Sequence, residues 1–257
     1  PEELDSFRPG EEKCIYLFDC ASREDMEREA QRLYLLGCLK LLAGCAGLAE
    51  SLPGYLGLRM GEKPQCRIEA NRLVVLCGSV NPITCSQMDY GEQRGYRRVH
   101  IPADRLLSGG KFNTGSDAMM MDYLWTLYCQ TPYLMIDSLQ TGREQVLLGT
   151  EELSLEDIRQ KISCQMGRIL KELIDRGADA CFMIIGGDTL LAFMDSIGCH
   201  ELTPVCELRP GVVLSRIAYG GRECEIISKS GGFGEEDLLV TLKGETEPLN
   251  QAQFAGA

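Results

Sequence analysis

Three loops in the sequence combine glycine with hydroxyl or charged side chains, and each follows an apolar run directly. They are Gly78-Ser79, Gly186-Gly187-Asp188-Thr189 and Lys229-Ser230-Gly231-Gly232-Phe233-Gly234. Exposed N–H groups in a glycine-rich loop or at a helix N-terminus attract anions without the help of a cationic side chain. Glycine also lets the backbone approach a phosphate group closely. The three loops therefore predict a site for a phosphate group or a nucleotide.

The polar side chains of these loops suggest particular contacts. Asp188 or Thr189 is expected to cap the following helix, and either oxygen could reach a magnesium ion or its water shell. Lys229 would offer a point charge to phosphate, and Ser79 would donate a hydrogen bond to a nucleotide. Each loop also has a structural explanation, because a tight turn, a solvated lysine or a satisfied strand end would use the same residue types.

Several common enzyme classes lack their signatures here. The sequence contains no G-x-x-x-x-G-K-[ST], no G-x-G-x-x-G, and no G-x-S-x-G around Ser79. His100 and His200 have no clear partner, and the 13 cysteines include no C-x-x-C pair, so no metal site is predicted. We expect the cysteines to be reduced thiols that pack as small hydrophobic side chains, as in a cytoplasmic protein.

Composition narrows the class of protein and of partner. The 257 residues are 44% hydrophobic and 25% charged, which is the balance of a globular protein. A formal net charge of -12 argues against binding to nucleic acid or to an anionic membrane. No apolar run approaches the roughly 20 residues that cross a bilayer, and no signal sequence opens the chain.

Apolar runs alternate with amphipathic stretches, which indicates an α/β fold with an open mixed or parallel sheet flanked by helices. Three Ser/Thr residues with an acid or amide three positions later match a capping box: Ser22 with Asp25, Thr84 with Gln87, and Ser154 with Asp157. A helix is expected after each capping box, and two further helices are expected at 44–52 and at 117–129. Strands are expected at 15–18, 39–43, 73–77, 97–101, 133–136, 180–185, 212–219 and 223–228.

Two finer predictions concern packing and domain boundaries. Met119, Met120 and Met121 are expected to fill the core. The polar stretch 61–65 is the best internal boundary. It divides the chain into residues 1–60, a nucleotide-binding domain at 61–244, and a flexible tail at 245–257.

The loops and their surroundings, in this order, resemble the four-carbon acid sugar kinase family. The matching stretches are Ala43-Gly44-Cys45-Ala46-Gly47-Leu48-Ala49, Gly78-Ser79-Val80 with Gln87, Gly186-Gly187-Asp188-Thr189, Glu207-Leu208-Arg209-Pro210-Gly211-Val212 and Lys229-Ser230-Gly231-Gly232-Phe233-Gly234. The resemblance covers about residues 15–242. It implies the end of an N-terminal sugar-acid-binding domain, or a connecting segment, at 1–60, followed by a C-terminal nucleotide-binding domain. Because the chain begins with Pro1, we expect that an initiator Met has been removed or that the chain starts within a longer protein.

The resemblance also implies an activity, which is phosphorylation of acids such as threonate, erythronate or 3-oxo-tetronates by ATP with Mg²⁺. The residues that match the ATP-contacting positions of the family are Ser79, Gly186, Gly187, Asp188, Thr189 and Gly231. The aspartate-rich D-D-x-T-G motif of the family is absent, so no catalytic residue is assigned. Leu190-Leu191 also stands where many members have Ser-Gly. A non-catalytic nucleotide-binding module, an NAD-dependent α/β enzyme and a homo-oligomer stay open.

Overall fold

The computed structural model describes residues 15–59, 61, 66–79, 81–108, 115–138 and 154–246. The chain divides into two compact units, Pro1–Lys63 and Pro64–Ala257. Most of the predicted boundary stretch at 61–65 and most of the predicted tail at 245–257 lie outside the described residues. Residues 245 and 246 complete the last helix of the second unit.

The described part of the first unit contains two helices and little buried surface. The predicted capping box is confirmed at α1 (Arg23–Leu35), where Ser22 Oγ accepts from the Asp25 N–H at 3.1 Å and Asp25 Oδ2 accepts from the Ser22 N–H at 3.1 Å. Helix α2 (Ala46–Ser51) follows. The strands expected at 15–18 and 39–43 are wrong, since these residues form no strand and Leu17 and Leu41 are 90% and 92% exposed. An apolar run becomes a strand only where a neighbouring strand can accept its backbone hydrogen bonds.

The second unit is built on one seven-stranded sheet with the order β2-β3-β1-β4-β7-β6-β5. Its strands are β1 (Leu73–Cys77), β2 (Arg97–His100), β3 (Tyr133–Asp137), β4 (Cys181–Ile185), β5 (Thr203–Arg209), β6 (Val212–Tyr219) and β7 (Arg222–Lys229). The first five strands in the order are parallel, whereas β6 runs antiparallel to β7 and β5 antiparallel to β6. The predicted α/β fold with an open mixed sheet is confirmed.

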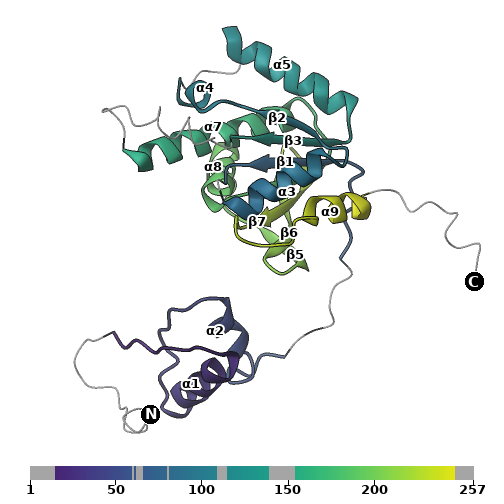
Figure 1. The fold of residues 1–257 in the computed structure, drawn as a ribbon. Coiled ribbons are helices and arrows are strands. Elements are labelled where there is room, and N and C mark those ends of the chain that lie inside the picture. The colour runs from purple at the N-terminus through teal and green to yellow at the C-terminus, as the bar shows by residue number, and fades with distance from the viewer. Residues whose placement is uncertain are drawn as a thin grey trace, which may run out of the picture. The chain divides into compact units, whose positions relative to one another are not determined.

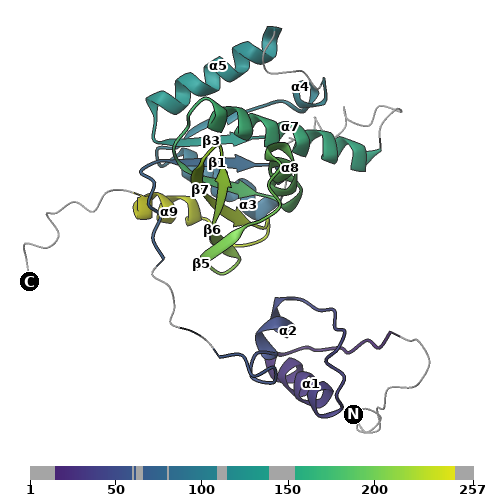
Figure 2. The same cartoon turned by 180° about the vertical axis from the view of Figure 1, so that it is seen from behind.

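Helices cover both faces of this sheet (Figures 1 and 2). They are α3 (Pro82–Glu92), α4 (Ala103–Ser108), α5 (Gly115–Gln130), α7 (Leu155–Asp175), α8 (Gly187–Ile197) and α9 (Leu238–Thr246). Val74 and Leu76 of β1 pack in the same cluster as residues of α5, α7 and α8, whereas Leu73 and Val75 pack with residues of α3 and α9. This alternation is the period-2 signature of a strand that is buried on both faces. None of the helices that the structure describes is long and apolar enough to span a membrane.

The second unit differs from expectation in the cap of α3, in the burial of one methionine and in an additional strand. Helix α3 begins at Pro82, with Asn81 as its N-cap: Asn81 Oδ1 accepts from the Ile83 N–H at 3.0 Å, so the capping box predicted at Thr84 is wrong. Met119 is 73% exposed, although Met120 and Met121 are buried as expected. Strand β5 was not predicted, and its interior Pro204 is unusual in a strand. The pairing register with β6 shifts between Pro204 and Cys206.

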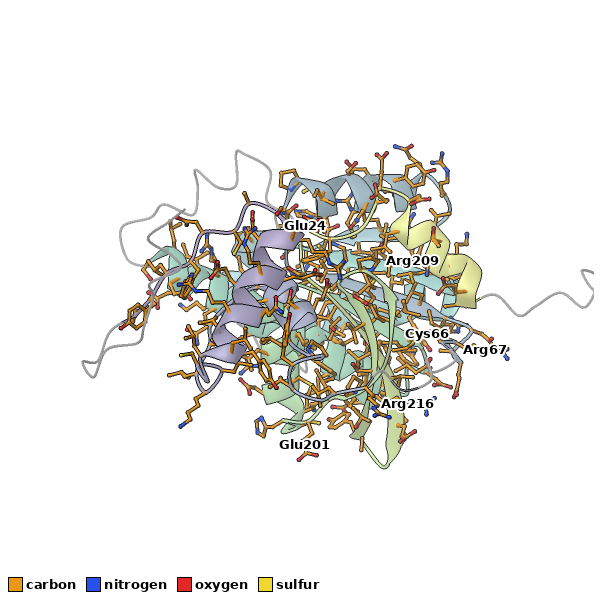
Figure 3. All side chains as sticks on the ribbon, turned by 90° about the horizontal axis from the view of Figure 1, so that it is seen from below. Glu24, Cys66, Arg67, Glu201, Arg209 and Arg216 are labelled. Atoms are coloured by element: carbon orange, nitrogen blue, oxygen red, sulfur yellow. A yellow bond between two sulfur atoms is a disulfide. The ribbon has the colours of Figure 1, made fainter. Side chains whose placement is uncertain are left out.

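One cysteine pair departs from the expectation of reduced thiols. Cys66 is bonded to Cys206 of β5, 140 residues later in the sequence. Figure 3 labels Cys66. The bond ties the segment that enters the second unit to an edge strand of the sheet. The other cysteines in the described ranges are free.

Candidate functional site

The carboxyl ends of five parallel strands lie in register at one edge of the sheet. The last residues of β2, β3, β1, β4 and β7 are paired across this edge in the order His100, Asp137, Cys77, Ile185 and Lys229. In open α/β sheets, ligands bind outside the carboxyl ends of the strands. The three loops singled out in the sequence follow β1, β4 and β7, so they all leave the sheet at this edge.

These loops come into direct contact with one another. A Cβ atom added to Gly78 would overlap the Thr189 side-chain oxygen, and one added to Gly231 would overlap the Ser79 side-chain oxygen. At Gly186 the added atom would lie 3.6 Å from Thr189 Oγ1. The structure therefore brings Ser79, Thr189 and Gly231 together, although they lie far apart in the sequence.

The loop after β4 is shaped by its own backbone. Gly186 has a φ of +113°, which side chains rarely adopt, and its N–H donates to the Lys229 carbonyl at 3.0 Å. Gly186 is also the N-cap of α8 and offers no side-chain cap, so the cap predicted at Asp188 or Thr189 is wrong. Gly187 and Asp188 are exposed, and no other atom lies within 4 Å of the position of a Cβ on Gly187. The uncapped N–H groups of this helix start can receive an anion.

The loop after β7 is held from beneath by two buried side chains of α3. Gln87 Nε2 lies 3.1, 2.9 and 2.9 Å from the carbonyl oxygens of Phe233, Gly234 and Glu235. Thr84 Oγ1 donates to the Gly231 carbonyl at 2.7 Å. Both side chains are 0% exposed. The sequence analysis assigned Thr84 and Gln87 to a helix cap and missed that they support this loop. The sequence does contain one indication of that role, because Gln87 belongs to the stretches that resemble the family.

Lys229 lies under the same loop. Its Nζ atom is 3.1 Å from the Ser230 carbonyl oxygen, 3.3 Å from that of Gly231 and 3.3 Å from Thr84 Oγ1. The residue is buried, and burial lowers the pKa of its ammonium to about 8. The sequence suggested a direct contact between this side chain and phosphate, whereas the structure directs it to loop carbonyls.

A cavity of about 540 Å³ borders this loop. Phe233 lines it together with Ile83 of α3 and with Arg209 and Pro210 of the β5–β6 hairpin. Gly211 in this hairpin has a φ of +72°, and a Cβ there would overlap the Phe233 ring. This close approach places the family-like stretch 207–212 against the glycine-rich loop. Ser79 and the residues 186–189 do not line this cavity.

The two remaining strand ends carry an acid and a histidine. Asp137 is fully buried, and its carboxylate lies 2.8 Å from His100 Nδ1 and 2.6 Å from Arg98 Nε. His100 therefore has a clear partner, contrary to expectation. Within the described ranges, no three His, Cys, Asp or Glu side chains are grouped so as to hold a metal ion.

Comparison with known proteins relates this arrangement to other sequences and structures. A family described as "Nucleotide-binding C-terminal domain" matches residues 74–239. The D-threonate kinase of Salmonella typhimurium is 22% identical over 231 residues, which are 88% of this chain and 52% of that protein. The chain thus spans about half the length of the curated relative that it matches.

Solved structures share the fold at low sequence identity. A protein of Salmonella typhimurium LT2 described as a putative tRNA synthase has a TM-score of 0.63 and 18% identity, covering 87% of this chain and 51% of that one. A Haemophilus influenzae protein has a TM-score of 0.61 and 16% identity, covering 88% and 52%. The chain belongs to the four-carbon acid sugar kinase family and contains its nucleotide-binding C-terminal domain.

Proposed function

We propose that this chain binds ATP with Mg²⁺ and supplies the nucleotide-binding half of a kinase that phosphorylates a four-carbon sugar acid. The observation that carries the proposal is the contact among the three glycine-containing loops after β1, β4 and β7, at the carboxyl edge of the sheet. Membership in a nucleotide-binding domain family and the similarity to D-threonate kinase support it. In this proposal the residues that contact ATP are Ser79, Gly186, Gly187, Asp188, Thr189 and Gly231.

The site has groups suited to phosphoryl transfer. The start of α8 and the glycine-rich loop offer backbone N–H groups to the phosphate oxygens, and such preorganised donors stabilise charge that develops during transfer. The exposed Asp188 carboxylate fits Mg²⁺ or its water shell, because hard cations prefer oxygen ligands. Bound Mg²⁺ would neutralise phosphate charge. The chain's own loops orient the phosphates, and no residue is assigned to accept the substrate proton.

The proposal is less specific about which sugar acid is bound and how it is oriented. D-threonate kinase is about twice as long as the matching region, so recognition of the acid is expected to draw on residues equivalent to the rest of that protein. A Bordetella bronchiseptica structure with a TM-score of 0.53 is described as a domain-swapped dimer with bound citrate. This description supports a homo-oligomer, which light scattering would measure.

The nucleotide part of the proposal can be tested by thermal unfolding. MgATP should raise the Tm of the parent, and Gly187→Val should abolish the shift without changing the unliganded Tm, because the space above Gly187 is open. Gly231→Val should also abolish it, since the added atoms collide with Ser79. Gly244→Val, in α9 with equally open surroundings, is the matched control. An ATP response that survives in both site variants, or a shift with NAD but not ATP, would contradict the proposal.

A further inference from the structure

We propose that Lys229 is a positioning residue which, with Thr84 and Gln87, holds the loop 230–234 in an anion-binding conformation and supplies positive charge from beneath it. The inference rests on the proposed nucleotide function. It concerns side chains that do not face the ligand. It differs from the direct phosphate contact that the sequence suggested for Lys229.

The first argument is the direction of the loop's backbone dipoles. The carbonyls of residues 230, 231, 233, 234 and 235 all accept hydrogen bonds from the three buried side chains. The N–H groups of Gly231 and Gly232 donate to no group among the described residues. Because the carbonyls of residues 230, 231, 233 and 234 are engaged by these side chains, the loop leaves the two N–H donors for an outside acceptor. The three side chains thereby select the orientation that a phosphate group requires.

The second argument is the charge of Lys229. Lys229 is 3% exposed, and its ammonium contacts only neutral oxygens; within the described ranges no carboxylate forms an ion pair with it. A buried charge without a counter-ion is unfavourable, and an anion bound across the thin loop would compensate it. The polyphosphate of a nucleotide is such an anion. The site therefore gains attraction for phosphate although the chain as a whole carries a net charge of -12.

The third argument concerns protons. Because burial lowers the pKa of Lys229 to about 8, much of the unliganded protein has a neutral Lys229 at pH 8.5. A bound polyanion favours the ammonium and raises this pKa, so binding at pH 8.5 takes up protons. The titratable group that interacts electrostatically with Lys229 is Cys77 on β1, which interacts in turn with Cys85 on α3 and Asp137 on β3. Burial raises the pKa of Cys77 to about 12 and also raises that of Cys85, so both thiols are predominantly neutral at pH 8.5.

Calorimetry tests the inference. MgATP is titrated into the whole chain at pH 8.5 in two buffers with different ionisation enthalpies, and the difference gives the protons taken up. The parent should take up about half a proton or more per ATP bound. Lys229→Met should lose this uptake and weaken ATP binding by about 10-fold or more. Thr84→Val should weaken binding in the same direction, whereas Thr84→Ser, which keeps the hydroxyl, should restore it.

Controls separate the role of Lys229 from folding and from the proposed function. Cys85→Ser should keep the proton uptake of the parent, and circular dichroism checks that each variant is folded. If Lys229→Met does not fold, the test rests on the parent and on Cys85→Ser. If neither of these proteins takes up protons when it binds MgATP, the inference is overturned. Unchanged affinity and uptake in a folded Lys229→Met also overturn it. Inorganic tripolyphosphate is titrated in parallel: if it binds with uptake but ATP does not bind, the nucleotide function fails and the inference stands. If neither ATP nor tripolyphosphate binds, both the proposed nucleotide function and the inference about Lys229 are overturned.

Discussion

Two loops of the site, 186–189 and 230–234, are held in place by different kinds of interaction. The loop at 186–189 is fixed by backbone and packing: Gly186 adopts a conformation that other residues rarely adopt, and α8 behind it lies tightly on α7, where a Cβ on Gly167 would come within 2.6 Å of the Phe193 nitrogen. The loop at 230–234 lies against α3 and the start of α9. It is held instead by the buried polar side chains of Thr84, Gln87 and Lys229.

The two kinds of support make the two loops sensitive to different substitutions. The loop at 186–189 should lose its conformation only when the packing of α8 on α7 is disrupted, because no single polar side chain holds it in place. The second should respond to the loss of one donor or one proton, because a partly satisfied buried network is costly. The first loop is thus coupled to global stability and the second to side-chain chemistry.

The largest expected effect breaks the support of the first loop. Gly167→Ala would place a methyl group 2.6–2.9 Å from backbone atoms of Ala192 and Phe193, which cannot rotate away. Overpacking of this kind should lower the free energy of unfolding by about 3 kcal/mol or more. Urea denaturation measures the loss. Gly187→Ala adds the same atom in open space and should leave the free energy unchanged; an equal loss in both variants would contradict the packing argument.

The titration of Lys229 makes the support of the second loop sensitive to pH. The pKa of Lys229 is lowered from 10.5 to about 8 in the folded protein, so between these values the unfolded chain binds more protons than the folded one. The contribution of Lys229 to the free energy of unfolding therefore rises with pH across this window, by up to about 3 kcal/mol. Lys229→Met should lack this rise. Denaturation of both proteins from pH 7 to 10.5 measures the difference, and parallel pH curves would refute it.

A smaller effect is expected when the second loop loses one donor. Gln87→Glu keeps the size of the side chain but turns a carboxylate toward the carbonyls of residues 233–235. Unfolding free energy should fall by about 2 kcal/mol at pH 7, and less in acid, where the new carboxyl group is protonated and can donate again. Gln93→Glu adds the same charge at an exposed position at the end of α3 and is the control. A similar loss at both positions would show that charge on the helix, not the loop contact, is responsible.

The sequence predicted those parts of the fold that depend on local or periodic signals. The cap at Ser154 is confirmed, because Ser154 and Asp157 each bond to the other's backbone N–H, and Ile158 and Ile162 of the expected stripe are buried. The hairpin at Gly220-Gly221 joins β6 and β7 as expected. Such features need only residues that are close in the chain.

Features decided by distant residues were not predictable in this way. Thr84 and Gln87 have the spacing of a capping box, yet Pro82 starts the helix two residues earlier, and their side chains turn to a loop about 147 residues away. Strand β5 carries Pro204 and is stabilised by its pairing with β6, which no local pattern reveals. The approach of Ser79, Thr189 and Gly231 was expected from the rule on strand ends, and the structure brings them together. Their contact with ATP stays a prediction.

The bond between Cys66 and Cys206 closes the chain from 66 to 206 into a covalent ring. Strands β1 to β4 and the first two loops lie within this ring, and the loop at 230–234 lies outside it. A protease that cut the ring once would leave both fragments in one molecule of unchanged mass apart from one added water. Such damage would be invisible on a non-reducing gel and would show only after a thiol had opened the ring.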